Sequence, residues 1–164
     1  MGDQESSKWE GEIIVELKTL TPQQVWPLIA DFCSLDKLCP HLEKCYLVEG
    51  VLGEPGMIRC CESSNFGGEG AAKYAKERLL MIDPSNMCLS YDIVDNNAGF
   101  KSYVATMRLF PVINGDDGKC WCKFVWNFVA DPVDGFTLEG LLELLNGIAQ
   151  AMAKKMEEAF SDQS

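Results

Sequence analysis

A glutamate lies in the middle of a stretch that is typical of a β-strand, residues 71–83 (AAKYAKERLLMID). Side chains alternate between the two faces of a strand, so Glu77 shares its face with the apolar side chains that lie two and four residues away. These are Ala75, Leu79 and Met81. A carboxylate that is buried without a partner costs several kcal/mol. We therefore expect Glu77 to meet either an opposite charge or a polar ligand atom.

An arginine holds a matching position on the preceding predicted strand, Met57 to Ser63. Alternation places Arg59 on the same face as Met57 and Cys61, which is also the face of Glu77. Together, a carboxylate and a guanidinium can move a proton and stabilise an anion. The same two residues can instead form a structural salt bridge, or the arginine head group can reach solvent while its stem is buried. The residues alone leave these interpretations open.

Three aromatic residues with polar groups are predicted on the same inward face, namely Tyr91, Tyr103 and Trp126. Phenol and indole groups need hydrogen-bond partners when they are buried. Inward aromatic side chains usually fill a core, and we predict that role for Phe124 and Phe128. Three polar aromatic side chains near two charges favour a ligand pocket.

The elements that must position these residues follow one another in a simple order. We predict a first strand from Trp9 to Leu20, then a helix with Thr21 as N-cap and Pro22 at its first position. A short helical turn from Ser34 to Leu38 follows. Turn-rich segments then separate six predicted strands, which are Lys44 to Glu49, Met57 to Ser63, Ala71 to Asp83, Cys88 to Asp95, Phe100 to Val112 and Lys119 to Ala130. The last element is a long helix with an apolar stripe from Leu138 to Phe160.

This order predicts the α+β class, with a curved, seven-stranded antiparallel sheet that wraps around the C-terminal helix. Cys120, Cys122, Phe124, Trp126 and Phe128 form one wholly apolar face of the last strand, which we expect to face the helix. No repeat or low-complexity linker divides the chain. We predict one domain over residues 8–161, with flexible ends at 1–7 and 162–164.

Charge and composition narrow the classes of partner. The chain has 164 residues and a formal net charge of −11, which argues against nucleic acid and against an anionic membrane surface. Gly2 and Ser6 match the pattern for N-myristoylation, but Asp3 and Glu5 give no basic second membrane signal. We therefore expect no stable membrane anchoring. The start also lacks the features of a secretory signal, which predicts a cytoplasmic protein.

Cysteine and histidine usage points away from disulfide and metal chemistry. The chain has eight cysteines, which we interpret as reduced thiols rather than a disulfide framework. Cys120 and Cys122 share a face, but no second pair or nearby histidine completes a zinc site. His41 is the only histidine, which excludes most catalytic schemes based on histidine unless His41 is itself the base. We expect neither a metal nor a cofactor.

Several short motifs, in order, give the chain a family resemblance. They are KWEG at 8–11, PQQVW at 22–26, LVEG at 47–50, AKE at 75–77, NM at 86–87, YVATM at 103–107, the strand tryptophan Trp126 and KMEE at 155–158. With these, the chain resembles the plant lachrymatory-factor synthase family. That family lies within the START-like superfamily, together with birch-pollen-type allergens, abscisic-acid receptors and polyketide cyclases. The resemblance covers nearly the whole chain and implies the helix-grip fold, with a cavity between sheet and long helix.

The resemblance also implies roles for the inward residues. Glu77 would take the hydroxyl proton of an alkenyl sulfenic acid and return a proton to carbon, while Arg59 would stabilise negative charge on the sulfur-bound oxygen. Tyr91, Tyr103 and Trp126 would line the cavity. Ile148 would line it from the long helix, at a position where the synthases have a tryptophan.

Two departures from the synthases change the predicted shape of the pocket and leave the substrate open. One is Ile148, and the other is Lys73 with Tyr74, where the synthases have an aromatic pair. The alternative function is a carrier or sensor that binds a small hydrophobic metabolite, lipid or hormone without transforming it. A third alternative is an interaction protein that works through its acidic surface.

Overall fold

Seven antiparallel strands form one sheet in the computed structural model, which describes residues 8–64 and 72–161. The strands are β1 (Trp9–Leu17), β2 (Lys44–Glu49), β3 (Ile58–Ser63), β4 (Lys73–Asp83), β5 (Cys88–Asn96), β6 (Tyr103–Ile113) and β7 (Cys120–Ala130). Their order across the sheet is β1-β7-β6-β5-β4-β3-β2. The predicted flexible ends, with Gly2 and Ser6 of the myristoylation pattern, lie outside the described residues.

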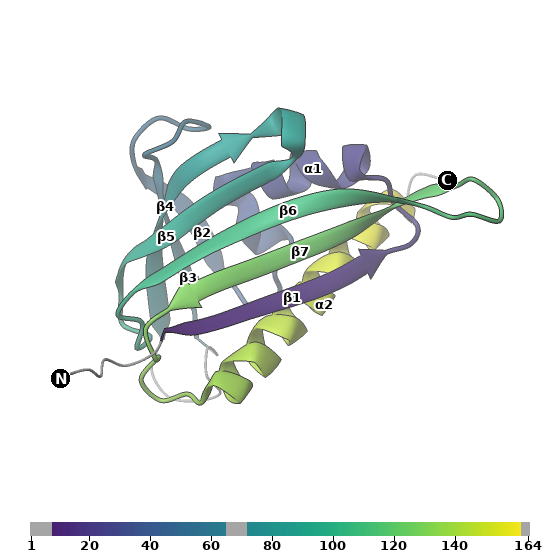
Figure 1. Cartoon of the computed structure of the whole chain (residues 1–164). Coiled ribbons are helices and arrows are strands. Elements are labelled where there is room, and N and C mark those ends of the chain that lie inside the picture. The colour runs from purple at the N-terminus through teal and green to yellow at the C-terminus, as the bar shows by residue number, and fades with distance from the viewer. Residues whose placement is uncertain (1–7, 65–71, 162–164) are drawn as a thin grey trace.

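The long helix α2 (Leu138–Ser161) lies across one face of this sheet (Figure 1). Between β1 and β2 come the helix α1 (Pro22–Ala30) and the 3₁₀ helix η1 (Phe32–Lys37), and a 3₁₀ turn, η3 (Pro84–Asn86), joins β4 to β5. The predicted α+β helix-grip fold is therefore confirmed, including two short helices after the first strand.

Local sequence signals explain where α1 begins. The Thr21 hydroxyl accepts a hydrogen bond from the backbone N–H of Gln24, and the Gln24 side chain accepts one from the backbone N–H of Thr21. This reciprocal capping box, with Pro22 at the first helical position, confirms the predicted start. β1 ends earlier than predicted, at Leu17, which is its last residue paired with β7. The next helical turn begins earlier too, at Phe32 rather than Ser34.

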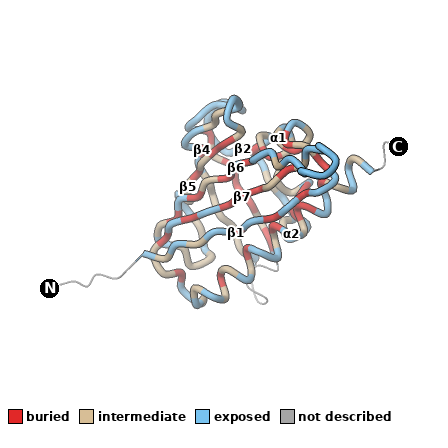
Figure 2. The backbone as a smooth tube through the Cα atoms, turned by 45° about the vertical axis from the view of Figure 1, so that its right-hand side comes forward, coloured by how far each residue is buried: buried red, intermediate tan, exposed pale blue. Residues whose placement is uncertain are grey.

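The core lies between α2 and the concave face of the sheet. Buried and exposed positions alternate along β6 and β7, as expected for a sheet with one covered face (Figure 2). From α2, the buried residues are Leu141, Leu145, Ala149, Met152, Ala153 and Met156. β1 approaches α2 closely at Gly11, where a Cβ atom would lie 2.5 Å from both Leu142 Cδ2 and Phe128 Cε1.

Two register shifts interrupt the pairing of β4 with β5. Leu79 pairs with Tyr91 but Met81 pairs with Ser90, so Leu80 is an extra residue in β4. This bulge turns Met81 to the outer face, where 38% of the residue is exposed. The prediction that Met81 shares a face with Glu77 is therefore wrong.

The other wrong prediction of a face concerns the start of β7. Cys120 is exposed rather than part of the covered apolar face, because it pairs with the exposed Ile113 at the tip of the β6–β7 hairpin. This tip extends beyond the helices (Figure 1). The rest of the predicted face is confirmed, and Cys122, Phe124, Trp126 and Phe128 are buried.

Strand β2 forms one edge of the sheet and pairs only with β3. Its register shifts between Leu47 and Glu49, so Val48 is an extra residue in the edge strand. The side chains near this bulge are largely exposed, with Tyr46 at 43% and Val48 at 44%.

Candidate functional site

A cavity of about 110 Å³ lies between the concave face of the sheet and α2. All six residues that the sequence singles out contribute to its wall, namely Arg59, Glu77, Tyr91, Tyr103, Trp126 and Ile148. They come from β3, β4, β5, β6, β7 and α2. The fold therefore brings together residues that are as much as 89 positions apart, from 59 to 148.

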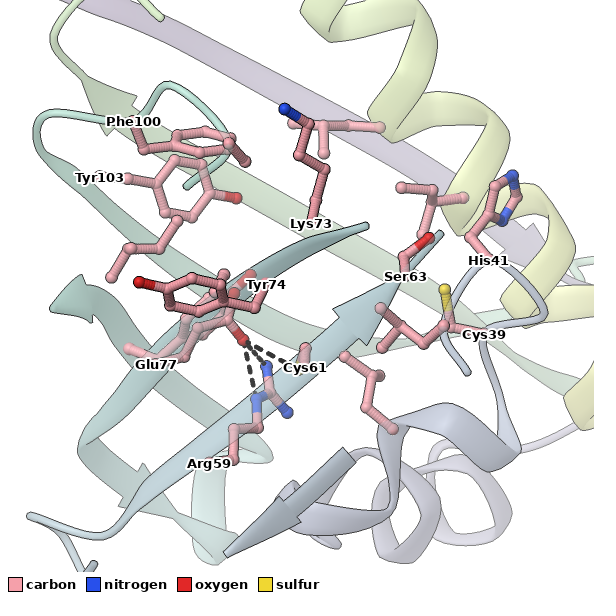
Figure 3. Close-up of a pocket in the computed structure, with 18 of the residues that line it drawn as sticks. Cys39, His41, Arg59, Cys61, Ser63, Lys73, Tyr74, Glu77, Phe100 and Tyr103 are labelled. Carbon is pink, nitrogen blue, oxygen red and sulfur yellow. Dashed lines mark hydrogen bonds and ion pairs between the residues drawn. The ribbon is translucent and has the colours of Figure 1, made fainter. Parts of the chain in front are cut away.

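Arg59 and Glu77 form a buried ion pair on this wall. They stand directly opposite each other in the β3–β4 register, so their side chains share a face. Arg59 Nε donates to Glu77 Oε1 at 2.8 Å, and Arg59 Nη2 forms an ion pair with the same oxygen at 2.7 Å (Figure 3). The side chains are only 4% and 13% exposed, respectively. Within the described part of the chain, no hydrogen bond reaches the second carboxylate oxygen, Oε2.

A residue that the sequence did not single out, Phe32, completes the surroundings of Arg59. Arg59 Nη1 donates to the Phe32 carbonyl oxygen at 2.7 Å. The centre of the guanidinium also lies 3.7 Å from the centroid of the Phe32 ring, which is a close cation–π contact. The first residue of η1 therefore holds the arginine through both its backbone and its side chain. No pattern near Phe32 signals this contact, because the two residues are 27 positions apart.

The charges of this site depend on one another. Burial is the largest single effect and would lower the pKa of Arg59, but the charge of Glu77, together with smaller contributions from Cys61, Tyr91 and Cys45, raises that pKa above its ordinary value. Arg59 is consequently a permanent cation. Cys61 is also close, with its Sγ 3.8 Å from Glu77 Oε1. The sequence placed Cys61 on this face without assigning it a role.

The two tyrosines of the cavity are neutral hydrogen-bonding groups. The Tyr91 and Tyr103 ring centroids lie 6.0 Å apart, and the Tyr103 ring stacks on Phe128 at 5.6 Å. Burial raises the pKa of both phenols, and the charge of Glu77 adds to this effect. Figure 3 shows the Tyr103 hydroxyl directed into the cavity. The Tyr91 hydroxyl interacts with the Tyr103 hydroxyl, so Tyr103 is the phenol that is positioned to donate a hydrogen bond to a ligand atom.

Trp126 contributes a buried hydrogen-bond donor that has no acceptor at normal hydrogen-bond distance. Its indole Nε1 has no such partner in the residues that the structure describes, and its interaction with the Tyr103 hydroxyl, which lowers the pKa of Tyr103, is too long to satisfy the donor. Such a group costs about 1–3 kcal/mol relative to one with a partner. The residue also lines the cavity. A ligand with an acceptor atom at this wall would remove the cost.

The described residues show neither a membrane span nor a clustered metal site. No helix in residues 8–64 and 72–161 is long and apolar enough to cross a bilayer. In the same ranges, no group of three or more His, Cys, Asp or Glu side chains is arranged to hold a metal ion.

Comparison with known proteins agrees with this architecture. The family model described as "Polyketide cyclase / dehydrase and lipid transport" matches residues 12–161. The abscisic acid receptor PYL2 of Arabidopsis thaliana is 25% identical over 132 residues, which are 80% of this chain and 67% of the receptor. The finer resemblance to lachrymatory-factor synthases stays a prediction.

Solved structures share the fold at low sequence identity. The XoxI protein of Bacillus cereus superposes with a TM-score of 0.67 at 23% identity, over 96% of this chain and 98% of XoxI. Major latex-like protein 151 of Panax ginseng gives a TM-score of 0.66 at 18% identity, over 89% of this chain and 97% of that protein. The fold, its cavity and the match over residues 12–161 lead to one assignment: the chain belongs to the polyketide cyclase / dehydrase and lipid transport family of START-like proteins.

Proposed function

We propose that this protein binds a small, largely apolar molecule in the cavity between the sheet and α2. The observation that carries the proposal is the buried Trp126 Nε1–H on the wall of a cavity, a donor with no acceptor at normal hydrogen-bond distance in the described residues. The ligand would place an acceptor atom, such as a carbonyl or S–O oxygen, against this donor. A hydrogen-bond donor on the ligand would meet Glu77 Oε2.

Size and lining support the same class of ligand. A single bound water needs roughly 10–15 Å³ of cavity volume. A cavity of about 110 Å³ therefore has room for several waters or for a small organic molecule. Leu35, Ile93 and Met107 contribute apolar wall, while the charged Arg59 and Glu77 lie together on one side. The family description names lipid transport, and the Arabidopsis relative is named for abscisic acid.

The cytoplasmic location expected from the sequence also stays a prediction.

Trp126→Phe tests the binding proposal, because it removes the N–H and keeps an aromatic ring. A thermal-shift screen of small apolar molecules, with abscisic acid among the first probes, would identify a ligand. Losing one hydrogen bond to that ligand should weaken binding by about 0.5–1.5 kcal/mol, which is roughly 2- to 13-fold in Kd.

Trp121→Phe is the matched control, since Trp121 lies in the same strand and contacts Lys18 rather than the cavity. It should bind the ligand like wild type. Equal affinity in the Trp126→Phe variant for a ligand with an acceptor would contradict the proposal.

A second candidate function, catalysis, is favoured by the Arg59–Glu77 pair. A buried ion pair seldom stabilises a fold more than apolar side chains would. Its position on the cavity wall therefore favours a catalytic role over a purely structural one. Following the family resemblance, Glu77 would remove the S–O–H proton of an alkenyl sulfenic acid. A proton would return to the alkene carbon that does not carry sulfur, while the adjacent carbon forms a C=S bond. Arg59 would stabilise the negative charge on oxygen.

Glu77→Gln separates the two functions, because it keeps the shape of the side chain and removes the base. Wild type and variant would be supplied with an alkenyl sulfenic acid generated in situ, and thioaldehyde S-oxide would be measured. Product from wild type alone would establish Glu77 as the proton shuttle. Product from both proteins would show that Glu77 is not the shuttle. No product from either folded protein would leave ligand binding as the function.

A further inference from the structure

Two cysteines face each other across the edge of the sheet, beside the ion pair. Cys45 in β2 and Cys61 in β3 are direct partners in the antiparallel register. Their sulfur atoms lie 3.8 Å apart, close to van der Waals contact. Direct partners in an antiparallel pair have Cα atoms about 4.5–5.5 Å apart, which lies inside the range of about 4.4–6.8 Å found in disulfides. Side-chain rotation and a small movement of β2 can therefore join the two sulfurs.

The position of β2 makes such a movement easy. It is a six-residue edge strand with a bulge, and its other edge has no partner strand among the described residues. An interior strand would have to break pairing on both sides to move by the same amount. Cys45 is half-buried and Cys61 is buried, so an oxidant from solvent reaches Cys45 first.

The two thiols also differ in reactivity. The hydrogen bond from the Cys61 thiol, and the charge of Arg59, lower the pKa of Cys45 to about 7 although burial opposes this. The same hydrogen bond, burial and the charge of Glu77 raise the pKa of Cys61. At neutral pH, Cys45 is thus partly a thiolate, the nucleophilic form, while Cys61 keeps its proton. Burial raises the pKa of Cys33, Cys39 and Cys122.

We propose that Cys45 and Cys61 form an oxidation-sensitive dithiol that closes to a cross-strand disulfide in the presence of a peroxide. The Cys45 thiolate attacks one peroxide oxygen, which gives the Cys45 sulfenic acid and releases water or an alcohol. The Cys61 sulfur then attacks the Cys45 sulfur, and the hydroxyl leaves as water with the Cys61 proton. Two electrons pass from the thiols to the peroxide.

Formation of the disulfide would change the cavity wall, because both sulfur atoms contact groups that surround the Arg59–Glu77 pair. Cys61 Sγ lies 3.8 Å from Glu77 Oε1, and Cys45 Sγ lies 3.8 Å from the Phe32 carbonyl that also accepts from Arg59. The disulfide carries neither an S–H nor a thiolate charge, so neither sulfur can donate to these oxygens and Arg59 loses the negative charge of Cys45 nearby. The oxidation state of the dithiol therefore changes the surroundings of Glu77 and Arg59 together. This inference goes beyond ligand binding and does not depend on it.

The test is a peptide map of the full chain after brief exposure to hydrogen peroxide. Trypsin cleaves after Lys44, Arg59 and Lys73, so Cys45 lies alone in one peptide and Cys60 and Cys61 lie in another. We expect these two peptides to be linked, and the free thiols to fall from eight to six. The rate should rise roughly tenfold per pH unit below pH 7 and level off above it, as Cys45 ionises.

Cys60→Ser is the matched control, because Cys60 is the neighbour of Cys61 on the opposite face of β3. This variant should keep the link and Cys61→Ser should lose it, leaving a Cys45 sulfenic acid that a dimedone-type reagent traps. Three results would overturn the proposal. They are a link through Cys60, oxidation of Cys120 with no link, and over-oxidation of Cys45 in wild type with no link. Fragmentation of the linked wild-type peptide between Cys60 and Cys61 decides the question even where a variant fails to fold.

Discussion

At the scale of single residues, the site depends on how completely Arg59 is held. Its guanidinium donates to Glu77 from Nε, forms an ion pair with the same carboxylate through Nη2, donates to the Phe32 carbonyl and stacks on the Phe32 ring. Glu77 has no comparable set of partners, since both contacts with Arg59 reach the same oxygen. Arg59 is therefore the fixed member of the pair, and Glu77 is the member that is available to a ligand.

Removing one member of the pair should cost far more stability than removing both. Arg59→Met should lower the free energy of unfolding by about 3–5 kcal/mol, because it leaves a buried carboxylate without a counter-ion. The double variant Arg59→Met, Glu77→Leu should recover much of this loss. Urea unfolding monitored by circular dichroism would measure both.

The control for this experiment is an exposed pair that joins the neighbouring strands β4 and β5. Arg78 Nη2 lies 2.7 Å from Asp92 Oδ2, but the Arg78 side chain is 45% exposed. Arg78→Met should cost less than about 1 kcal/mol. Equal losses from the buried and the exposed arginine would show that Arg59 is not held as described.

The buried tyrosines should make the fold sensitive to high pH. Burial raises the pKa of Tyr91 and Tyr103 above the ordinary value of 10.0. Above pH 10 the unfolded chain loses phenol protons that the native state keeps, so unfolding releases protons. The contribution of the two neutral phenols to the free energy of unfolding is thus fully present below pH 10. Above pH 10 the free energy of unfolding falls by about 1.4 kcal/mol per pH unit for each tyrosine.

Urea midpoints between pH 8 and pH 11 would measure this slope. The double variant Tyr91→Phe, Tyr103→Phe should flatten it. Tyr74→Phe should change it less, because the Tyr74 hydroxyl bonds to Asp95 at the surface. A slope that survives the double variant would mean that other groups control the alkaline transition.

The sequence predicts those parts of the site that follow from alternation, and it misses those that follow from three-dimensional packing. Arg59 and Glu77 stand out because each interrupts an apolar face. The contact with Phe32 leaves no such trace, since it joins a 3₁₀ helix to a strand. The approach of Cys45 to Cys61 is also hidden, because it depends on the register of two strands joined by an irregular loop.

At the scale of elements, alternation along a strand predicts the wrong face for side chains that follow a bulge. The order of the elements along the chain, including α1 and α2, follows from periodicity and capping, and the structure confirms it. Leu80, an extra residue in β4, shifts the following side chains by one position and turns Met81 outward. No residue type near Leu80 indicates a bulge in the sequence. The bulge is fixed by the register of β4 with β5, which a single sequence does not show.

The contact of β1 with α2 should be sensitive to one methyl group. A Cβ atom at Gly11 would meet the buried Phe128 ring and the Leu142 side chain at 2.5 Å. Gly11→Ala should therefore lower stability by about 1–2 kcal/mol, since overpacking outweighs the entropy gained by replacing glycine. Phe128 stacks on Tyr103, so the displaced ring should also weaken ligand binding.

Chemical unfolding and a ligand titration would measure both effects of Gly11→Ala. Gly115→Ala is the control, because no atom lies within 4 Å of the Cβ position there. It should leave both quantities unchanged. A Gly11→Ala protein with wild-type stability would show that α2 is not tightly seated on β1.

At the scale of the whole molecule, the net charge of −11 should oppose folding at low salt. The screening length falls from about 30 Å at 0.01 M salt to about 8 Å at 0.15 M. The urea midpoint should accordingly rise over this range. Sodium and potassium chloride should act alike, and a midpoint that falls would mean that specific ion pairs outweigh the general repulsion.

The extra residue Val48 has a consequence for how copies of the molecule meet. An edge strand with free N–H and C=O groups is a template on which another chain can add a strand, and Tyr46, Leu47 and Val48 would make that addition apolar as well. The bulge breaks the regular spacing of these groups, and the strand is only six residues long. The bulge at Val48 therefore makes the open edge of the sheet a poorer template for such an addition.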